Sequence, residues 1–336
     1  MCLRCFAVLV WILAAPASAS HTTTFKIATI APDGTGWMVE MREGAKRITR
    51  RTDNRVKFRF YPGGVMGNDK SVLRKLRIGQ LHGGAITGGG LALIDPNTLI
   101  YSLPFTFRSE GEVDYARAHM DPVLIESLEE AGFVTLGFVE GGFAYLMSNA
   151  PLHGMEDLQG KKVWIPEGDR ISRAVFEDMN ISPIPLPLPD VLTGLQTGLI
   201  DTVGASAIGA IALQWHTRIK YVTDTPLIYL YGALLIDRRA FLKLDAKDQT
   251  VVREVMSEIA ARLKSQTRED DRKATQALKN QGITFVTPSQ EAVMSLHRSV
   301  ARTANRLAED GVVPLHLLEE LRAHLNDYRR TAGATP

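Results

Sequence analysis

Trp164, Glu167 and Asp169 form the densest group of chemically capable side chains in this chain. The indole offers an apolar face and one N–H donor, and the two carboxylates offer acceptors or a general acid–base pair. A β-branched and aromatic run that is typical of a strand ends at Ile165, and Pro166 stops it. Because ligands of open α/β sheets bind beyond the carboxyl ends of the strands, these residues predict one edge of a pocket.

The same residues also fit a structural interpretation. Trp164 would then pack in the core, the carboxylates would be solvated, and Asp169 would cap a helix beginning at Ile171. No metal-binding or nucleophile motif follows residue 20, and no histidine there has a second histidine three or four positions on. We therefore expect no catalytic residue, no metal and no cofactor.

The elements that must position these groups alternate between strand and helix signals in two blocks. The chain has 336 residues, 45% hydrophobic and 23% charged, which is ordinary for globular proteins and long enough for two domains. A dispersed net charge of +2 argues against nucleic acid as a partner. The alternation predicts an α/β protein of two lobes with a central cleft.

Residues 1–19 have the features of a signal peptide. Arg4 supplies a short basic region, Cys5–Ala15 is continuously apolar, and a small-x-small pattern ends at Ala19. We expect cleavage after Ala19 and export to the periplasm, and this would remove the cysteines Cys2 and Cys5. The alternative is a retained amphipathic anchor.

Three further segments bear on the architecture. Asp245–Gln281 lacks proline and glycine and predicts a helix of roughly 55 Å that bridges two lobes, with a coiled-coil dimer as the alternative. The alternating prolines of Ile184–Pro189 favour an extended connection and exclude a central strand. Gly88–Gly90 lacks the features of a phosphate loop and predicts a tight strand-to-helix turn, although its bare N–H groups also suit close approach to a ligand.

Four segments, in order over nearly the whole mature chain, are similar to motifs of the solute-binding proteins of TRAP transporters, the dicarboxylate-receptor (DctP) family. They are a strand with a Tyr-Pro turn, a Leu-Pro-Phe-x-Phe segment, an Asp-Leu-x-Gly-x-Lys-hydrophobic stretch and a Leu-Gln-Thr-Gly-x-x-Asp motif. They lie at Phe58–Asp69, Leu103–Phe107, Asp157–Val163 and Asp190–Asp201.

The resemblance implies two α/β lobes, a multi-crossing hinge and one long helix under both lobes. We expect lobe I to comprise residues 20–142 plus 230–269, and lobe II residues 143–229 plus 270–330. Family members capture a solute in the periplasm and deliver it to a sodium-driven permease of a small and a large membrane subunit, without chemistry on the ligand. The alternatives are a ligand sensor that presents its bound form to a membrane signalling partner, and a derivative that became an enzyme or a structural envelope component.

This chain departs from the family at the usual carboxylate clamp. The family's substrate-binding arginine corresponds to Trp164, and a second family arginine corresponds to Ala144. A pocket asparagine falls near Ala205 and a pocket phenylalanine near Leu188. An indole in place of a guanidinium favours an aromatic, apolar or cationic solute over a simple carboxylate.

The expected ligand-binding set draws on both lobes and contains aromatic, acidic and small residues. It consists of Trp164, Glu167, Asp169, Phe143, Tyr145, Leu188, Trp37, Asp33, Asn68 and Gly88.

Overall fold

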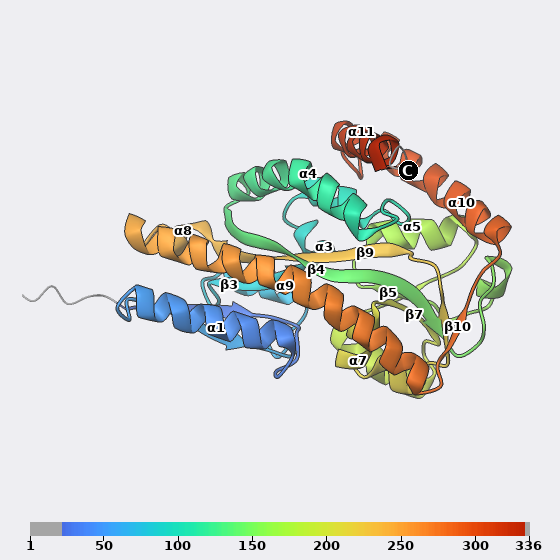
Figure 1. Ribbon diagram of the computed structural model, residues 1–336, viewed down its shortest axis with the longest axis horizontal. Coiled ribbons are helices and arrows are strands. Elements are labelled where there is room, and N and C mark those ends of the chain that lie inside the picture. Colours follow the sequence, from blue (N-terminus) through green and yellow to red (C-terminus); the bar gives the residue numbers. More distant parts are fainter. Residues whose placement is uncertain (1–21, 333–336) are drawn as a thin grey trace, which may run out of the picture.

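The computed structural model describes residues 22–332 and confirms the two-lobed α/β architecture (Figure 1). The predicted signal peptide lies outside the described residues. No helix in the described range is both long and apolar enough to cross a membrane.

The first lobe is built on a mixed sheet with the strand order β2-β1-β3-β9-β4, in which β1 pairs parallel with β2 and β3. The strand β9 (Ile228–Asp237) pairs antiparallel with both β3 and β4 (Phe133–Ser148). Its first strands and helices are β1 (Thr23–Ala28), α1 (Gly36–Arg51), β2 (Val56–Tyr61), α2 (Asp69–Arg77), β3 (Gly83–Thr87) and α3 (Gly88–Leu91). Each of the three helices begins at a side-chain cap, with Thr35, Asn68 and Thr87 accepting a backbone N–H.

Two long strands connect the lobes. β4 (Phe133–Ser148) and β9 (Ile228–Asp237) pair antiparallel from Phe133↔Asp237 to Ala144↔Ile228, with irregularities after Thr135 and Glu140. Beyond this pairing β4 continues into the second lobe, where it pairs with β7 (Thr202–Ala205) and β8 (Tyr221–Thr223). The chain therefore crosses between the lobes within a continuous strand and returns in a second one.

The remaining elements of the second lobe surround this sheet. They are β5 (Trp164–Pro166), α5 (Arg170–Asp178), β6 (Ile184–Leu186), α6 (Val191–Thr197), α7 (Ala207–Ala212) and β10 (Thr284–Val286). The extended proline segment is in part a strand, because β6 pairs parallel with β5. Its prolines are tolerated because β6 has β5 as its one partner in a two-stranded sheet.

The predicted long helix is α9 (Ala246–Asn280), which Asp245 caps by accepting the Asp248 N–H. It packs against α1 and β4 and then against α7, so it underlies both lobes (Figure 1). The buried stripe in its first half includes Val252, Ile259 and Leu263.

Three further long helices pack against other helices. α4 (Glu110–Glu130) packs against α11 (Leu315–Ala332), and α10 (Gln290–Glu309) packs against α5. α11 thus lies with first-lobe elements, although the segment 270–330 was expected in lobe II. The lobe boundaries as a whole stay a prediction. The short helices are α8 (Arg238–Phe241), η1 (Pro96–Ser102), η2 (Glu156–Leu158), η3 (Leu188–Asp190) and η4 (Trp215–Arg218).

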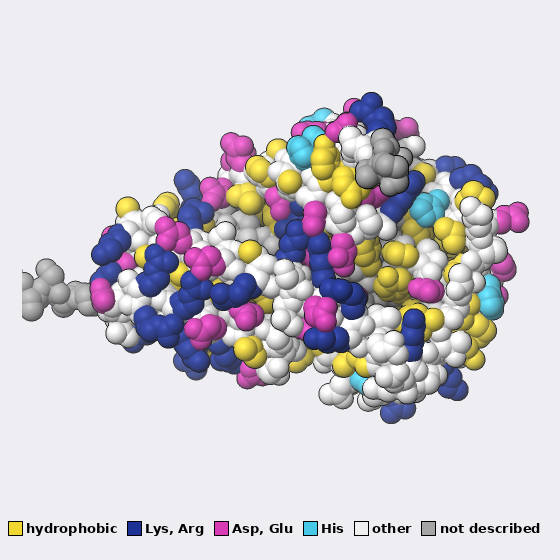
Figure 2. Space-filling model, viewed as in Figure 1, with side chains coloured by type: hydrophobic (Ala, Val, Ile, Leu, Met, Phe, Trp, Pro, Cys, Tyr) yellow, Lys and Arg dark blue, Asp and Glu magenta, His cyan; other side chains and the backbone are white. Residues whose placement is uncertain are grey.

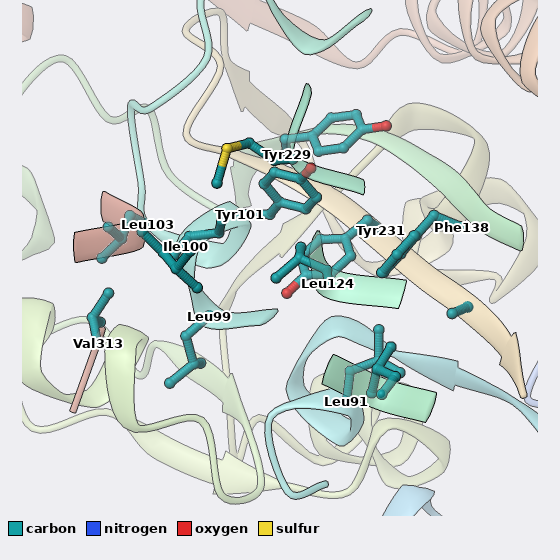
Figure 3. Packing of buried hydrophobic residues seen from close by; sticks show 14 of the residues in the cluster. Leu91, Leu99, Ile100, Tyr101, Leu103, Leu124, Phe138, Tyr229, Tyr231 and Val313 are labelled. Carbon is teal, nitrogen blue, oxygen red and sulfur yellow. The ribbon is translucent and has the colours of Figure 1, made fainter. Parts of the chain in front are cut away.

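The largest buried cluster holds the α4 and α11 layer against the sheet (Figure 3). At its centre the ring of Tyr101 packs edge-on against Tyr231 at 5.4 Å and near Phe138 at 6.4 Å between ring centroids. The Tyr231 hydroxyl donates to the carbonyl of Thr98 at 2.6 Å, which satisfies the polar end of the ring. Ile171 of α5 belongs to the same cluster, so the two lobes are in contact.

Gly83 in β3 provides a stability test of the strand packing. A methyl group at this position would lie 2.4 Å from the carbonyl oxygen of Leu235 in β9. We expect Gly83→Ala to lower the free energy of unfolding by about 1–3 kcal/mol in urea titrations, because overpacking forces the strands apart. Gly204→Ala in β7 is the matched control, since nothing lies within 4 Å of its added methyl group. Equal losses in both variants would contradict this account.

Candidate functional site

The two lobes touch at Asn68 and Glu167, residues that are 99 positions apart. Asn68 caps α2 by accepting the Ser71 N–H through Oδ1 at 3.0 Å, and its Nδ2 donates to Glu167 Oε2 at 2.8 Å. Close by, a Cβ at Gly64 would lie 3.4 Å from Pro189 of the second lobe. The structure therefore brings together one predicted site residue from each lobe, with the helix cap fixing the Asn68 side chain.

Trp164 lies in the buried cluster of the second lobe. Its side chain is only 6% exposed, and its Nε1 donates to the carbonyl of Leu186 at 3.1 Å. The ring packs edge-on against Trp215 at 5.2 Å, in a cluster that also contacts Tyr145 and Leu188. Three predicted site residues are thus brought together, and the single N–H of the indole is already used within the protein.

Asp169 caps α5, as the structural interpretation of the sequence expected, and its role in ligand binding stays a prediction. Its carboxylate accepts the Ser172 N–H at 2.9 Å and the Ser172 hydroxyl at 2.6 Å. Burial raises the pKa of this carboxyl above its ordinary value, although the hydrogen bonds to Ser172 and Ile171 oppose the shift. The positive end of α5 is therefore occupied by a carboxylate of the chain itself.

Asp69 is a feature of the site that sequence reasoning missed. It accepts the Thr87 hydroxyl, and burial raises its pKa to about 6. The position of a Cβ at Gly90 lies 2.6 Å from the Asp69 carboxyl carbon, and one at Gly88 lies 2.6 Å from the Tyr231 ring. The glycine run is thus explained by close packing of an acid and an aromatic ring. Gly88 stays a predicted ligand contact, and the Thr-Gly-Gly-Gly sequence was the available signal for this packing.

Asp271 of α9 was also missed. Its carboxylate accepts the Ile208 N–H at 2.9 Å at the start of α7, beside the helix cap Ser206. Burial raises the pKa of Asp271, with hydrogen bonds to Ile208 and Ala207 opposing the shift. The beginnings of α5 and α7 thus each carry a half-buried carboxylate, and neither is left free for an anionic ligand.

Phe143 and Tyr145 alternate with Ala144 along β4. Phe143 packs edge-on against Tyr229 at 5.7 Å. Burial raises the pKa of the Tyr145 hydroxyl, and the negative charges of Asp271, Asp224 and Glu110 raise it further. Tyr145 therefore packs against the apolar cluster of the second lobe and lies in the field of three negatively charged carboxylates.

Asp33 and Trp37 lie around the start of α1 and contact first-lobe residues. Asp33 is exposed and pairs with Arg42 at 2.8 Å, which holds the pKa of its carboxyl below the ordinary value. Trp37 is half-buried against the cluster that joins α1, the sheet and α9. The described contacts do not join either residue to the Trp164 cluster.

The most deeply placed arginines near the crossing strands are neutralised by the chain. Arg117 pairs with Asp121 at 2.9 Å and also contacts the Tyr229 hydroxyl at 3.3 Å. Arg268 binds Asp114 at 2.6 Å and a second carboxylate, Glu140, at 2.8 Å. Within residues 22–332, no group of three or more His, Cys, Asp or Glu side chains is arranged to hold a metal ion.

The raised pKa of Asp69 predicts a specific pH dependence of stability. The unfolded chain releases the Asp69 proton near the ordinary pKa of 3.8, whereas the folded protein keeps it up to about pH 6. The contribution of Asp69 to stability is therefore fully present at low pH and is lost as the pH rises through this window. Between about pH 4 and about pH 8, we expect the wild type to lose about 2–3 kcal/mol of unfolding free energy more than Asp69→Asn. Urea titrations of both proteins across this range measure the difference. Glu126→Gln, at an exposed carboxylate of α4, should follow the wild type; parallel curves for all three proteins would refute the prediction.

Comparison with known proteins identifies the family. The family model described as bacterial extracellular solute-binding protein, family 7 (DctP), matches residues 27–310. A solute-binding protein of Verminephrobacter eiseniae is 27% identical over 276 residues, covering 80% of this chain and 81% of the relative. The C4-dicarboxylate-binding periplasmic protein DctP of Rhodobacter capsulatus is 24% identical over 263 residues, covering 77% of each.

Solved structures agree in fold. The sugar acid binding protein DctPAm of Advenella mimigardefordensis, in complex with galactonate, superposes with a TM-score of 0.85 at 17% identity, covering 91% of this chain and 99% of that one. A TRAP periplasmic solute-binding protein of Haemophilus influenzae with bound L-gulonate gives a TM-score of 0.84 at 18% identity, with the same coverage. This chain therefore belongs to family 7 of the bacterial extracellular solute-binding proteins, and it is a TRAP-type solute receptor rather than an enzyme.

Proposed function

We propose that this receptor binds an organic solute with an aromatic or apolar body and an uncharged or cationic polar group. The observation that carries the proposal is Trp164, at the position where the family resemblance puts the carboxylate-binding arginine. The indole is buried, and its donor is committed to the Leu186 carbonyl. The resemblance puts the family's second arginine at Ala144 and a pocket asparagine near Ala205, and both of these buried alanines lack a hydrogen-bonding side chain.

The charges around the lobe contact support the same solute class. Glu167 and Asn68 meet across the lobes, the half-buried Asp69 and Asp169 are their chain neighbours, and Asp271 accepts a backbone N–H at the start of α7. A carboxylate solute entering this region would face repulsion from these carboxylates. A cation would be attracted by the same carboxylates and would find aromatic faces for cation–π contact.

The cellular role follows from the family resemblance. In this proposal the chain is exported, cleaved after Ala19, and delivers its solute in the periplasm to a small and a large membrane subunit of a TRAP permease. A sensor role is the second candidate. Deleting the permease genes separates the two: loss of solute uptake supports transport, whereas intact uptake with loss of a transcriptional response to the solute supports sensing.

A matched series of aryl solutes tests the solute class. Phenethylammonium, phenethyl alcohol and phenylacetate share one body and differ in the charge of the polar end. We expect the first two to raise the melting temperature and phenylacetate to leave it unchanged. A ligand that binds only the folded state stabilises it by an amount that grows with its affinity and concentration. Succinate and galactonate represent the solute class named for relatives and neighbours. Stronger stabilisation by either of them than by the aryl cation and alcohol would overturn the proposal.

A further inference from the structure

A concave site lies between the N-terminal half of α10 and the loop that precedes α4. Its volume is about 600 Å³, within the range of small-molecule pockets. Phe105, Phe107, Val293 and Met294 supply most of its apolar wall. Figure 2 shows hydrophobic side chains gathered in a hollow beside α10. None of the predicted cleft residues lines this groove.

The apolar layer under α10 is incompletely filled. A second cavity of about 30 Å³ shares Phe105 and Val293 with the groove and continues inward to Leu146 and Leu296. Met294, on the groove side, is 48% exposed, whereas Val300 further along the same helix is 2% exposed. Protein interiors are normally close-packed, so the unfilled apolar space of the groove and the adjoining cavity is suited to an added apolar group.

The backbone at the wall of the groove is strained. Phe105 has a φ of 56°, a left-handed conformation that is rare for a bulky side chain and costs about 1–3 kcal/mol. Its N–H donates to the Leu227 carbonyl at 2.8 Å, and its ring stacks on His297 with a centroid distance of 4.2 Å. The surrounding structure thus holds the Phe105 ring at the groove wall in spite of the strain.

The groove is positively charged. Arg108 and Arg298 both line it and are exposed, and among the described residues neither forms an ion pair. Other arginines of this region are neutralised, such as Arg329 by Glu112 at 2.8 Å. No aspartate or glutamate of residues 22–332 is among the lining residues. Burial, together with the charges of Arg108 and Arg329, lowers the pKa of His297.

We propose that this groove binds an organic anion with one carboxylate head and an apolar body, of the class of medium-chain fatty acids. The head lies between Arg108 and Arg298, whose planar guanidinium groups suit bidentate contact with a carboxylate. The chain lies on Phe105, Phe107 and Val293 and displaces water from apolar surface. This site is distinct from the cleft between the lobes and has the opposite charge preference.

Calorimetric titration with three probes of equal chain length tests the charge preference. Decanoate is expected to bind, and decanol and decyltrimethylammonium to bind at least about tenfold more weakly, because a charge-assisted hydrogen bond contributes roughly that factor. The double variant Arg108→Gln/Arg298→Gln should lose decanoate binding by about tenfold or more. Arg302→Gln removes an exposed charge from the same helix outside the groove and should bind as the wild type does. Unchanged binding by the double variant would overturn the proposal, as would the absence of decanoate binding.

Crosslinking locates the bound probe. A decanoate carrying a diazirine at its tail should label residues 290–298 or 105–108 after irradiation, as read by peptide mass spectrometry. Labelling confined to the segment around Trp164 would place the fatty acid in the cleft and reject the second site. Failure of the aryl series while decanoate labels α10 would leave this inference standing and remove only the proposed function of the cleft.

Discussion

Replacing Trp164 with alanine is expected to lower the free energy of unfolding by about 3–5 kcal/mol. The side chain is 6% exposed and packs edge-on against Trp215 at 5.2 Å, so its removal leaves a cavity in the core of the second lobe. It also leaves the Leu186 carbonyl without the donor that now lies 3.1 Å away. Equilibrium urea unfolding followed by circular dichroism measures the loss.

Two variants sharpen this test. Trp164→Phe keeps much of the ring volume and loses the N–H, so it should fall between the wild type and Trp164→Ala. Trp37→Ala removes the other tryptophan of the predicted site, which is half-buried and should cost less. A loss below about 1 kcal/mol for Trp164→Ala would mean that the indole does not support the core, and our interpretation of its environment would be wrong.

Local sequence signals were sufficient for the elements that build the site. The absence of proline and glycine predicted α9 almost to its ends, because helix continuity depends on residues close in sequence. Asp169 was recognised as a helix cap from its position alone. A strand ending at Ile165 was predicted from β-branched and aromatic content, and the observed β5 extends one residue further, to Pro166. This strand pairs with β6 on one side, and the preceding Val163 forms a bridge to Thr202 of β7.

The features that could not be predicted from the sequence depend on contacts between residues far apart in the chain. The partial burial of Asp69 depends on α3, whose glycines let the carboxylate approach. Asp271 caps a helix 63 positions away, and no local pattern marks such a pairing. β6 formed despite its prolines because it needs hydrogen bonds on one side only. The contact between Asn68 and Glu167 likewise exists only once both lobes have folded and met.

A charged network at the strands that cross between the lobes joins three elements. Arg268 of α9 binds Glu140 of β4 through Nε at 2.9 Å and Asp114 of α4 through both terminal nitrogens. Burial alone would lower the pKa of the Arg268 guanidinium, and the bonds to Asp114 and Glu140 outweigh this effect and raise it. Glu140 itself is 3% exposed, so its charge depends on these partners. Its position beside a β4 irregularity places this charge where the strand crosses toward the second lobe.

Arg268→Met is therefore expected to destabilise the protein by about 3 kcal/mol, because it leaves the buried Glu140 charge with Arg117 alone, at 3.5 Å. Adding Glu140→Gln should recover part of the loss, since the unpaired charge is then removed. Arg262→Met is the matched control on the same helix: Arg262 is 47% exposed and pairs with Glu40, so its loss should cost at most about 1 kcal/mol. Urea unfolding of the three variants measures both effects. Equal losses for Arg268→Met and Arg262→Met, or no recovery in the double variant, would show that the Glu140 charge is not what Arg268 stabilises.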